Sequence, residues 1–435
     1  MRNPPMTELV LKSKFLAPLL IGMGLLLPVT CSGQVSCVAR FVMEKDSYLL
    51  GEPVFCRFAL QNTGTKTIQF SYRFPTRVLN RDLGQEPRFL TTDEAGNPLA
   101  DPAPRPCGGA KGSVVYGYAT LPPGQTHTER WLLNEWARFV HPGRTRVRAE
   151  RRLPVVVLDP VTNKPSALPA AYPMALNELW FTVQPATEEQ LHAAFRPYLD
   201  ALDSEVASDL PEALLVVTTL PQPFFLAKLQ AMATAPAREV RWDRKQILAG
   251  LARLGTPPAW ETILRIAQGT AMAPSRVSAV VGPEDLLLRA YAIALLGEKR
   301  DKAGLPALLG MVESVELRGD VLQTLGFFDD PRGSQILFEK LHAPKAFDRV
   351  NAILGLRNRE SKDVVPALLA MLNDPAAQVR QVAHFALQSL TGKRFPLSAR
   401  ASLEESARVA ARWRSWWREK GASFVPVRQP PCRDW

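Results

Sequence analysis

Residues Arg289–Gly297, which read RAYAIALLG, give the clearest indication of the architecture. The same pattern returns in Arg318–Gly326, which ends in VLQTLG, and once more, at an equal interval, in Val350–Gly355, VNAILG. A fixed period of about 29 residues is typical of a solenoid, in which each short unit is stable only against its neighbours. Such an array presents a long ridged surface, so the sequence predicts a protein that binds other macromolecules.

A second pair of segments shows that each period holds two helices. Residues 305–311 read LPALLGM and residues 365–371 read VPALLAM, and the two segments lie close to two periods apart. Pro306 and Pro366 fit the first turn of a helix, where the missing N–H would have no partner. The distance from Gly255 to Gly297 exceeds one period, and the excess fits a loop inserted over 269–283.

Residues 372–387 carry the clearest motif, with a loop D-P followed by V-R-x-x-A-x-x-A-L. The motif is met at Asp374, Pro375, Val379, Arg380, Ala383, Ala386 and Leu387. This pattern resembles the HEAT repeat, over about 284–391 and more loosely over 187–283. The resemblance implies an α-solenoid of helix pairs whose second helices form the concave face, the default binding surface of such arrays.

Three arginines recur at matching helical positions, Arg289, Arg318 and Arg380. The HEAT resemblance implies a structural ladder, in which each arginine pairs with a carboxylate or carbonyl of a neighbouring loop, such as Asp374. The alternative is that they line a groove and bind an acidic partner.

The last predicted helix, Leu403–Lys420, places Leu403, Ala407, Ala410, Trp413 and Trp417 on one stripe. We interpret it as a capping helix that covers the open face of the last repeat. The preceding Leu390-Thr391-Gly392-Lys393 followed by a Trp-rich helix resembles the end of other bacterial HEAT-repeat proteins, which favours capping. A membrane-interface or partner helix that uses Trp413, Trp416 and Trp417 is the alternative.

The first half of the chain indicates β structure. Strands are predicted near 38–42, 54–60, 67–72, 114–118, 126–133, 144–150 and 179–183, with loops over 79–112 and 159–178. The segments LGEPV (50–54), RFALQNTG (57–64), LPPGQ (121–125) and HPGRTRVRA (141–149) resemble bacterial immunoglobulin-like domains. The resemblance implies an antiparallel β-sandwich.

After Gln184 the spacing of apolar residues changes from that typical of strands to that typical of helices. Thr187 and Gln190 form a predicted capping box, and helices are predicted at about 187–202, 211–233, 239–254 and 258–268. The predicted organisation is a signal peptide (1–33), an immunoglobulin-like β-sandwich (34–185), HEAT-like repeats (186–398) and a Trp-rich capping helix with a tail (399–435).

The N-terminal segment predicts export. Arg2, Lys12 and Lys14 precede the short apolar run Phe15–Leu27, and small residues follow up to Gly33. Cleavage after Gly33 would give a secreted or periplasmic protein. A lipoprotein with lipidated Cys31, or an uncleaved anchor, is the alternative, and we expect membrane attachment only in those cases.

The remaining cysteines, Cys37, Cys56, Cys107 and Cys432, fit disulfides in an exported protein. Four cysteines allow three pairings, and the sequence does not choose among them. One pairing joins Cys37 to Cys56 across adjacent strands and Cys107 to Cys432. None of the cysteine spacings is C-x-x-C, so the sequence does not indicate a zinc site.

The formal charge is +11, and its densest stretch holds Arg144, Arg146, Arg148, Arg151 and Arg152. The first three alternate with other residues, so on a strand they share one face. We interpret them as a solvated arginine face, with an anion or membrane-surface patch as the alternative. An exported chain does not favour nucleic acid as the partner.

The sequence contains none of the common hydrolase or nucleotide-binding motifs. The glycine-rich 107–113 is interpreted as a loop, and the five histidines, His127, His141, His192, His342 and His384, show no metal-ligand spacing. We therefore predict a non-catalytic protein-binding or scaffolding protein without cofactor or metal. The alternative is an exported hydrolase, or a ligand- or inhibitor-binding sandwich, with its site in the loop over 79–112, where Asp82, Glu86, Asp93, Glu94 and Asp101 lie.

Overall fold

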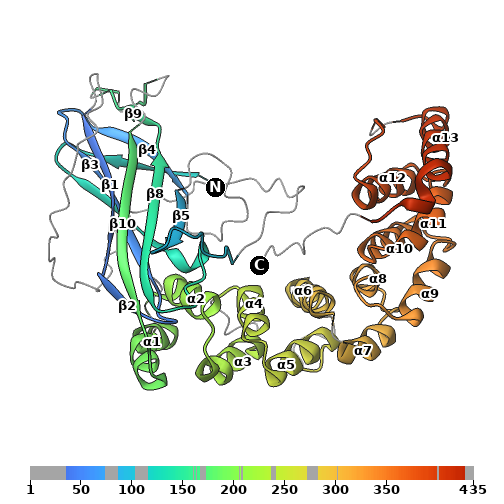
Figure 1. The fold of residues 1–435 in the computed structure, drawn as a ribbon, viewed down its shortest axis with the longest axis horizontal. Coiled ribbons are helices and arrows are strands. Elements are labelled where there is room, and N and C mark those ends of the chain that lie inside the picture. The colour runs from blue at the N-terminus through green and yellow to red at the C-terminus, as the bar shows by residue number, and fades with distance from the viewer. Residues whose placement is uncertain are drawn as a thin grey trace, which may run out of the picture. The chain divides into compact units, whose positions relative to one another are not determined.

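The computed structural model describes residues 36–73, 87–102, 116–159, 161–162, 164–166, 173–204, 206, 209–236, 242–271, 283–300, 302–398 and 401–426. Strands occupy the first part of this chain and end at Gln184, and α-helices begin at Glu188 (Figure 1). The protein is therefore a mixed α and β protein whose strands and helices are segregated along the sequence. The predicted signal peptide and the residues Cys31, Cys107 and Cys432 lie outside the described residues.

Within the described ranges the strands form three sheets. The strands are β1 (Cys37–Met43), β2 (Ser47–Leu49), β3 (Phe55–Asn62), β4 (Ile68–Arg73), β5 (Arg88–Asp93), β6 (Tyr116–Leu121), β7 (Thr126–Leu132), β8 (Gly143–Arg152), β9 (Val155–Val157) and β10 (Met174–Gln184). Their orders are β1-β3-β7, β2-β10-β8-β5 and β6-β4-β9. Pairing is antiparallel, except that β2 runs parallel to β10.

One buried cluster receives side chains from all three sheets. Phe58 of β3, Phe70 of β4 and Phe181 of β10 belong to it, and each is at most 2% exposed. The rings of Phe41 and Phe58 lie 5.1 Å apart, which is a favourable distance for an aromatic pair. Burial alternates along β10, with Leu179, Phe181 and Val183 inward, as period-2 patterning predicts for a sheet with one solvated face.

Two strands lie wholly or partly where the sequence predicts loops. β5 falls inside the predicted loop 79–112, and the first residues of β10 fall inside 159–178. Both are held by long antiparallel pairing with β8, because Phe89 lies opposite Ala149 and Leu176 lies opposite Glu150. Such long-range pairing overrides the local signal of nearby proline and glycine.

The α-helices follow in order. They are α1 (Glu188–Asp203), α2 (Leu210–Thr219), α3 (Leu226–Thr234), α4 (Arg244–Leu254), α5 (Pro257–Gln268), α6 (Pro283–Lys299), α7 (Leu305–Gly310), α8 (Arg318–Leu325), α9 (Pro331–Lys340), α10 (Ala346–Asn358), α11 (Val365–Met371), α12 (Ala377–Thr391) and α13 (Leu403–Lys420). The single helix predicted over 211–233 is interrupted between α2 and α3. Pro221 and Pro223 lie at the break, where their rings cannot continue a helix.

Local signals at the helix ends agree with the observed bounds. Thr187 and Gln190 form the predicted capping box at the start of α1. Pro306 and Pro366 are the second residues of α7 and α11, within the first turn. Gly255 and Gly269 end α4 and α5 with φ of 71° and 79°, a left-handed conformation that glycine adopts without a steric penalty.

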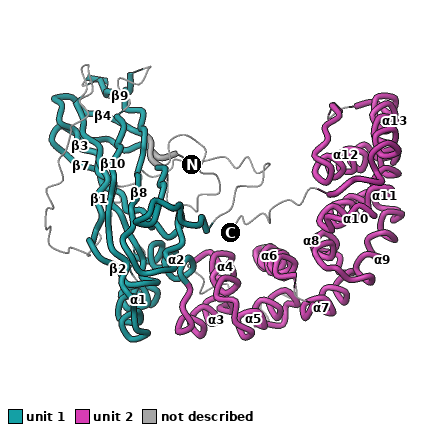
Figure 2. The backbone as a smooth tube through the Cα atoms, in the orientation of Figure 1, with its two compact units in different colours: residues 1–220, 433–435 teal, residues 221–432 magenta. Residues whose placement is uncertain are grey.

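The chain divides into two compact units at Leu220/Pro221 (Figure 2). The predicted boundary at 185/186 marks the change from strand to helix, but α1 and α2 belong to the strand-containing unit. An ion network explains the attachment of α2. Arg130 of β7 donates two hydrogen bonds to Glu44, at 2.8 and 2.7 Å, and a third to Glu212 of α2.

The second unit consists of paired helices. The pairs are α3/α4, α5/α6, α7/α8, α9/α10 and α11/α12, and α13 packs on α11. The second helices of successive pairs, α4, α6, α8, α10 and α12, contact one another in that order. Figure 1 shows them along one side of the unit, with the first helices along the other.

Glycine allows the close approach of neighbouring second helices. A Cβ atom on Gly326, which ends α8, would lie 1.8 Å from the Gly355 carbonyl oxygen of α10. A Cβ atom on Gly355 would lie 2.4 Å from the Leu322 carbonyl oxygen. The third glycine of this periodic set, Gly297, would meet Thr324 at 2.7 Å. The periodic glycine therefore marks the contact between successive pairs.

Candidate binding surfaces

Two exposed surfaces are candidates for a binding site. The first is the outward side of the second helices in the helical unit, and we call it the second-helix face. It is defined by Leu287 and Tyr291 on α6, Asp320 and Gln323 on α8, Phe347, Leu354 and Arg357 on α10, and Gln381 and Phe385 on α12. These residues are half-buried or exposed, whereas the other sides of the same helices are packed.

Side-chain contacts join neighbouring helices across this face. The Phe347 ring lies against Gly319 of α8, where an added Cβ would be only 2.9 Å from its Cζ. Gln323 of α8 donates to the side-chain oxygen of Asn351 on α10 at 2.7 Å. The Arg357 guanidinium lies 5.6 Å from the ring centroid of Phe385 on α12. The face is therefore continuous from α8 to α12.

The second-helix face has few charges and several large apolar side chains. Leu287, Phe347 and Phe385 are 57%, 55% and 49% exposed. Burial lowers the pKa of Arg357 and raises the pKa of Asp320, the two charged residues of the face. Apolar and aromatic side chains with few charges are the composition of the core of a protein–protein interface.

The three arginines that recur in the sequence lie between helix pairs. Arg289 of α6 donates to the Ala267 and Gln268 carbonyls at the end of α5, at 3.1 and 3.4 Å. The Arg318 Nε atom lies 2.8 Å from a carboxylate oxygen of Asp348 on α10. Arg380 of α12 donates to the Asp374 and Pro375 carbonyls at 2.9 and 3.0 Å. These partners are those of a structural ladder.

Sequence reasoning missed two members of this ladder. Arg349 of α10 forms a bidentate ion pair with the Asp374 carboxylate, with N–O distances of 2.8 Å for both hydrogen bonds. Arg244 of α4 pairs with Asp285 of α6. Arg349 lies 31 residues after Arg318 and 31 before Arg380, so it occupies the ladder position between them. A search at the 29-residue period reaches residue 347 instead and does not find it.

The second candidate surface is the outward side of β5, β8 and β10, and we call it the sheet face. Arg144, Arg146 and Arg148 of β8 point outward, as their alternation predicts. Arg151 does not join them, because it points into the core, is 4% exposed and pairs with Glu129 at 2.7 Å. Trp180 of β10 lies opposite Arg146, and the Arg144 guanidinium stacks 4.6 Å from its ring centroid.

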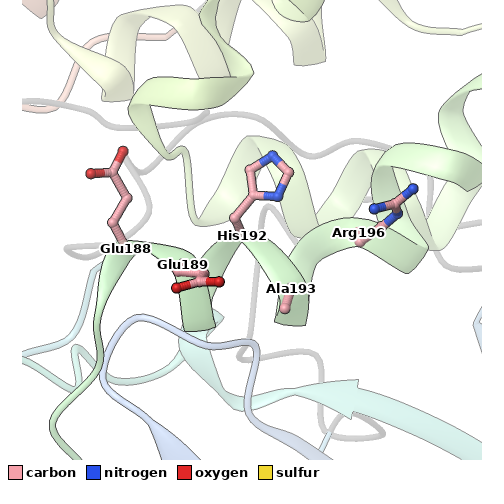
Figure 3. A pocket seen from close by; sticks show the side chains of 5 residues that line it. All are labelled: Glu188, Glu189, His192, Ala193 and Arg196. Atoms are coloured by element: carbon pink, nitrogen blue, oxygen red, sulfur yellow. The ribbon is translucent and has the colours of Figure 1, made fainter.

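A shallow hollow lies on the surface of α1, lined by Glu188, Glu189, His192, Ala193 and Arg196 (Figure 3). All five residues come from one helix, and Glu188, His192 and Arg196 each lie one helical turn apart, so they share a side. A hollow formed by one helix stays open to solvent, so it does not enclose a substrate. The acidic residues at the start of α1 also suit the positive end of the helix dipole.

The structure separates the cysteines that the sequence allows to pair. Cys37 lies opposite Asn62 in the β1–β3 register, and Cys56 lies opposite Met43, six positions further along. At about 3.4 Å a residue this is roughly 20 Å, well beyond the reach of a disulfide. The Cys37–Cys56 bond is therefore excluded, and the Cys56 side chain is fully buried. Every remaining pairing involves Cys107 or Cys432, outside the described residues.

The carboxylates of the alternative site do not form a cluster in the part of the chain that is described. Asp93 accepts hydrogen bonds from the Asn97 side chain and backbone amide, at 2.9 and 2.8 Å, and these bonds lower its pKa. This arrangement stabilises the turn after β5. Asp82 and Glu86 lie outside the described residues, and Glu94 and Asp101 are exposed.

The histidines are scattered along the chain. The contacts of His127 and His384 are structural. The His127 ring lies 3.2 Å from the Glu129 carboxylate on the same strand. His384 of α12 accepts a hydrogen bond at Nδ1 from the indole of Trp413 on α13, at 2.9 Å. No group of three or more His, Cys, Asp or Glu side chains within the described ranges is arranged to hold a metal ion. None of the helices in those ranges combines the length and apolar composition needed to cross a lipid bilayer.

Comparisons with known proteins identify no family. No family model matches the chain, and no curated protein does. Among solved structures, an engineered protein shows 16% identity over 47% of this chain and 91% of its own, with a TM-score of 0.26. Elastase-activated α2-macroglobulin from Escherichia coli shows 14% identity over 87% and 37% of the two chains, with a TM-score of 0.22. Aminopeptidase A from Legionella pneumophila shows 8% identity over 88% and 49%, with a TM-score of 0.25.

Proposed function

We propose that this chain is an exported, non-catalytic protein-binding or scaffolding protein whose second-helix face takes up a protein partner. In this proposal the helix pairs are HEAT-like repeats, the strands form an immunoglobulin-like sandwich, and residues 1–33 direct export. The observation that carries the proposal is the row of half-buried and exposed side chains on the successively packed helices α6, α8, α10 and α12. Among them Leu287, Phe347 and Phe385 are the exposed large apolar residues.

The ladder arginines support a passive role for the repeats. Arg289 and Arg380 donate to carbonyls within the array, and Arg318 contacts Asp348. These guanidinium groups are bonded between helix pairs. The second-helix face therefore does not use them to bind an acidic ligand. Recognition on this face rests on apolar and amide side chains, which suits a protein surface better than a nucleic acid.

The test is affinity capture from periplasmic extract with the full chain and two double variants. Phe347→Ser with Phe385→Ser removes the aromatic side chains of the face. Val315→Ser with Leu403→Ser is the matched control, because Val315 and Leu403 are 77% and 65% exposed and lie off the second helices. Loss of one well-placed aromatic residue typically costs about 2 kcal/mol or more of binding free energy.

We expect a protein that the wild type and the control retain and that the Phe347/Phe385 variant loses. Titration of that protein, once purified, is then expected to give a Kd about 30-fold higher for the variant. If both variants retain every captured protein as the wild type does, the second-helix face is not the binding surface and the proposal fails.

A further inference from the structure

The sheet face carries an excess of positive charge that the proposed function does not use. Its basic residues are Arg88 of β5 and Arg144, Arg146, Arg148 and Arg152 of β8. Its acidic residues are Glu150 of β8 and Glu178 of β10. Five arginines against two glutamates leave three positive charges in surplus on one side of three adjacent strands.

Most of this charge is available to a ligand. Arg146 pairs with Glu178, and both side chains are well exposed. Arg88, Arg144 and Arg148 are exposed, and within the described residues none of the three forms an ion pair. Solvated arginines of this kind gain from phosphate, which the guanidinium fork binds with two parallel hydrogen bonds.

Large apolar side chains stand between these arginines. Leu90 of β5 is 66% exposed and lies opposite Arg148. On β10, Leu176 is 46% exposed, and Met174 and Trp180 are each 38% exposed. Because alternate residues of neighbouring strands project on the same side, the apolar and basic side chains form one mixed layer.

We propose that the sheet face binds the surface of an anionic phospholipid bilayer. Trp180 matches the headgroup level, where indole rings are enriched, and Leu90, Leu176 and Met174 reach the acyl boundary. The surrounding arginines bury their stems beside these apolar side chains and place their guanidinium groups among the phosphates. Charge complementarity and the extended, sheet-like shape of the face together select a lipid surface over a small soluble anion.

The experiment measures partition of the full chain onto vesicles of pure phosphatidylcholine and of phosphatidylcholine mixed with a minor share of phosphatidylglycerol. The test variant is Arg88→Gln with Arg144→Gln and Arg148→Gln. The matched control is Arg408→Gln with Arg414→Gln and Arg418→Gln, which removes the same charge from exposed positions on α13. All chains keep the same basic N-terminal segment, so its own affinity for vesicles cancels in the comparison.

We expect the wild type to prefer the anionic vesicles and to lose this preference as salt rises. Each arginine near an anionic surface contributes about fivefold to partition, so the sheet-face variant is expected to bind about 100-fold more weakly. The control is expected to stay within about threefold of the wild type. Leu90→Ser with Leu176→Ser is expected to weaken binding to the anionic vesicles and to leave its salt dependence unchanged.

A lysine variant separates a lipid surface from an acidic protein. Arg88→Lys with Arg144→Lys and Arg148→Lys keeps the charge, so vesicle binding is expected to remain within about fivefold. Equal losses in the sheet-face and control variants overturn the proposal. So does a sheet face that retains an acidic protein from extract in an arginine-dependent way while ignoring both kinds of vesicle. Circular dichroism of each variant verifies that the strands remain folded.

Discussion

The strand unit and the helical unit hold themselves together over different distances along the chain. In the strand unit, Arg130 bonds Glu44 and Glu212, which lie 86 and 82 positions away. In the helical unit, Arg349 reaches Asp374 over 25 positions, Gln323 reaches Asn351 over 28, and Trp413 reaches His384 over 29. These three contacts each span about one repeat.

From these distances we predict how each unit responds to the loss of a core side chain. A unit whose contacts span its whole sequence has one core, and loss of a core side chain weakens all of it. A unit whose contacts join neighbours is close to a one-dimensional array, in which damage weakens the nearest repeats and leaves distant ones protected. The two units thus offer a test of cooperativity within one chain.

Two matched truncations of core side chains should lower stability the most. Phe58 of β3 and Trp413 of α13 are both 0% exposed, and replacing either with alanine should cost about 4 kcal/mol. Hydrogen exchange resolved by segment distinguishes the outcomes. Phe58→Ala is expected to lower protection in β1, β3, β8 and β10 alike, whereas Trp413→Ala is expected to lower it in α12 and α13 and not in α4 to α8.

The predicted difference between the two units is wrong if Trp413→Ala lowers protection evenly from α3 to α13. That result would mean that the helical unit folds as one body, and the description of its contacts as nearest-neighbour would be wrong. An even loss across the strands in Phe58→Ala, by contrast, is what a shared core requires.

The next effect probes the spacing between helix pairs. Gly326→Ala places a methyl group 1.8 Å from the Gly355 carbonyl oxygen, so the backbones of α8 and α10 must separate. Overpacking of this kind costs about 3 kcal/mol, and here the obstacle is backbone that no rotamer change relieves. Urea unfolding of the helical unit is the measurement, and a lower midpoint with protection lost around α8 and α10 is expected.

Gly310→Ala is the control for that substitution. Gly310 ends α7, its φ is not positive, and nothing lies within 4 Å of an added Cβ atom. Alanine has the better helix propensity there, so stability should stay level or rise by up to about 1 kcal/mol. Equal destabilisation by both substitutions would show that the close approach at Gly326 does not decide the outcome.

The glycines also show how far the sequence predicts the structure. Gly297, Gly326 and Gly355 reveal the period, and the period predicts the helix pairs from α7 to α12. The reason for glycine at that position is a contact between neighbouring repeats, which no single repeat contains. Sequence reasoning therefore finds the repetition and not its cause.

The candidate surfaces were predictable to different degrees. Alternation along 144–148 places three arginines on one side of a strand without any structure. The stacking of Trp180 on Arg144, and the presence of Leu90 beside Arg148, depend on the register of β5, β8 and β10. β5 lies in a stretch that reads locally as a loop, so the sequence alone cannot assemble this surface.

The smallest effect is a difference in acid sensitivity between the units. Burial lowers the pKa of His384 from its ordinary 6.5, and its Nδ1 atom must be unprotonated to accept the Trp413 hydrogen bond. In the strand unit, burial alone would raise the pKa of Glu44, but hydrogen bonds from Arg130 and Arg57 and their charges outweigh it and hold that pKa below 4.5.

The two groups lose their contributions to stability in different pH ranges. Because the folded pKa of His384 lies below its unfolded value, its contribution is complete above about pH 6.5 and declines as the pH falls toward the folded pKa. The contribution of Glu44 is complete above 4.5 and declines only as the pH falls further. Acidification from pH 7 to pH 5 is therefore expected to loosen α13 by about 1 kcal/mol, the net value of one hydrogen bond, and to leave the strands unaffected.

Hydrogen exchange of α13 and of β3 at the two pH values measures this difference, after correction for the intrinsic exchange rate. His384→Asn is the control, because its side-chain oxygen can accept the Trp413 indole hydrogen and does not titrate. In that variant α13 should keep its protection at pH 5. If α13 in the variant loosens as much as in the wild type, a group other than His384 senses the acid, and the Trp413–His384 hydrogen bond does not control the acid sensitivity of α13.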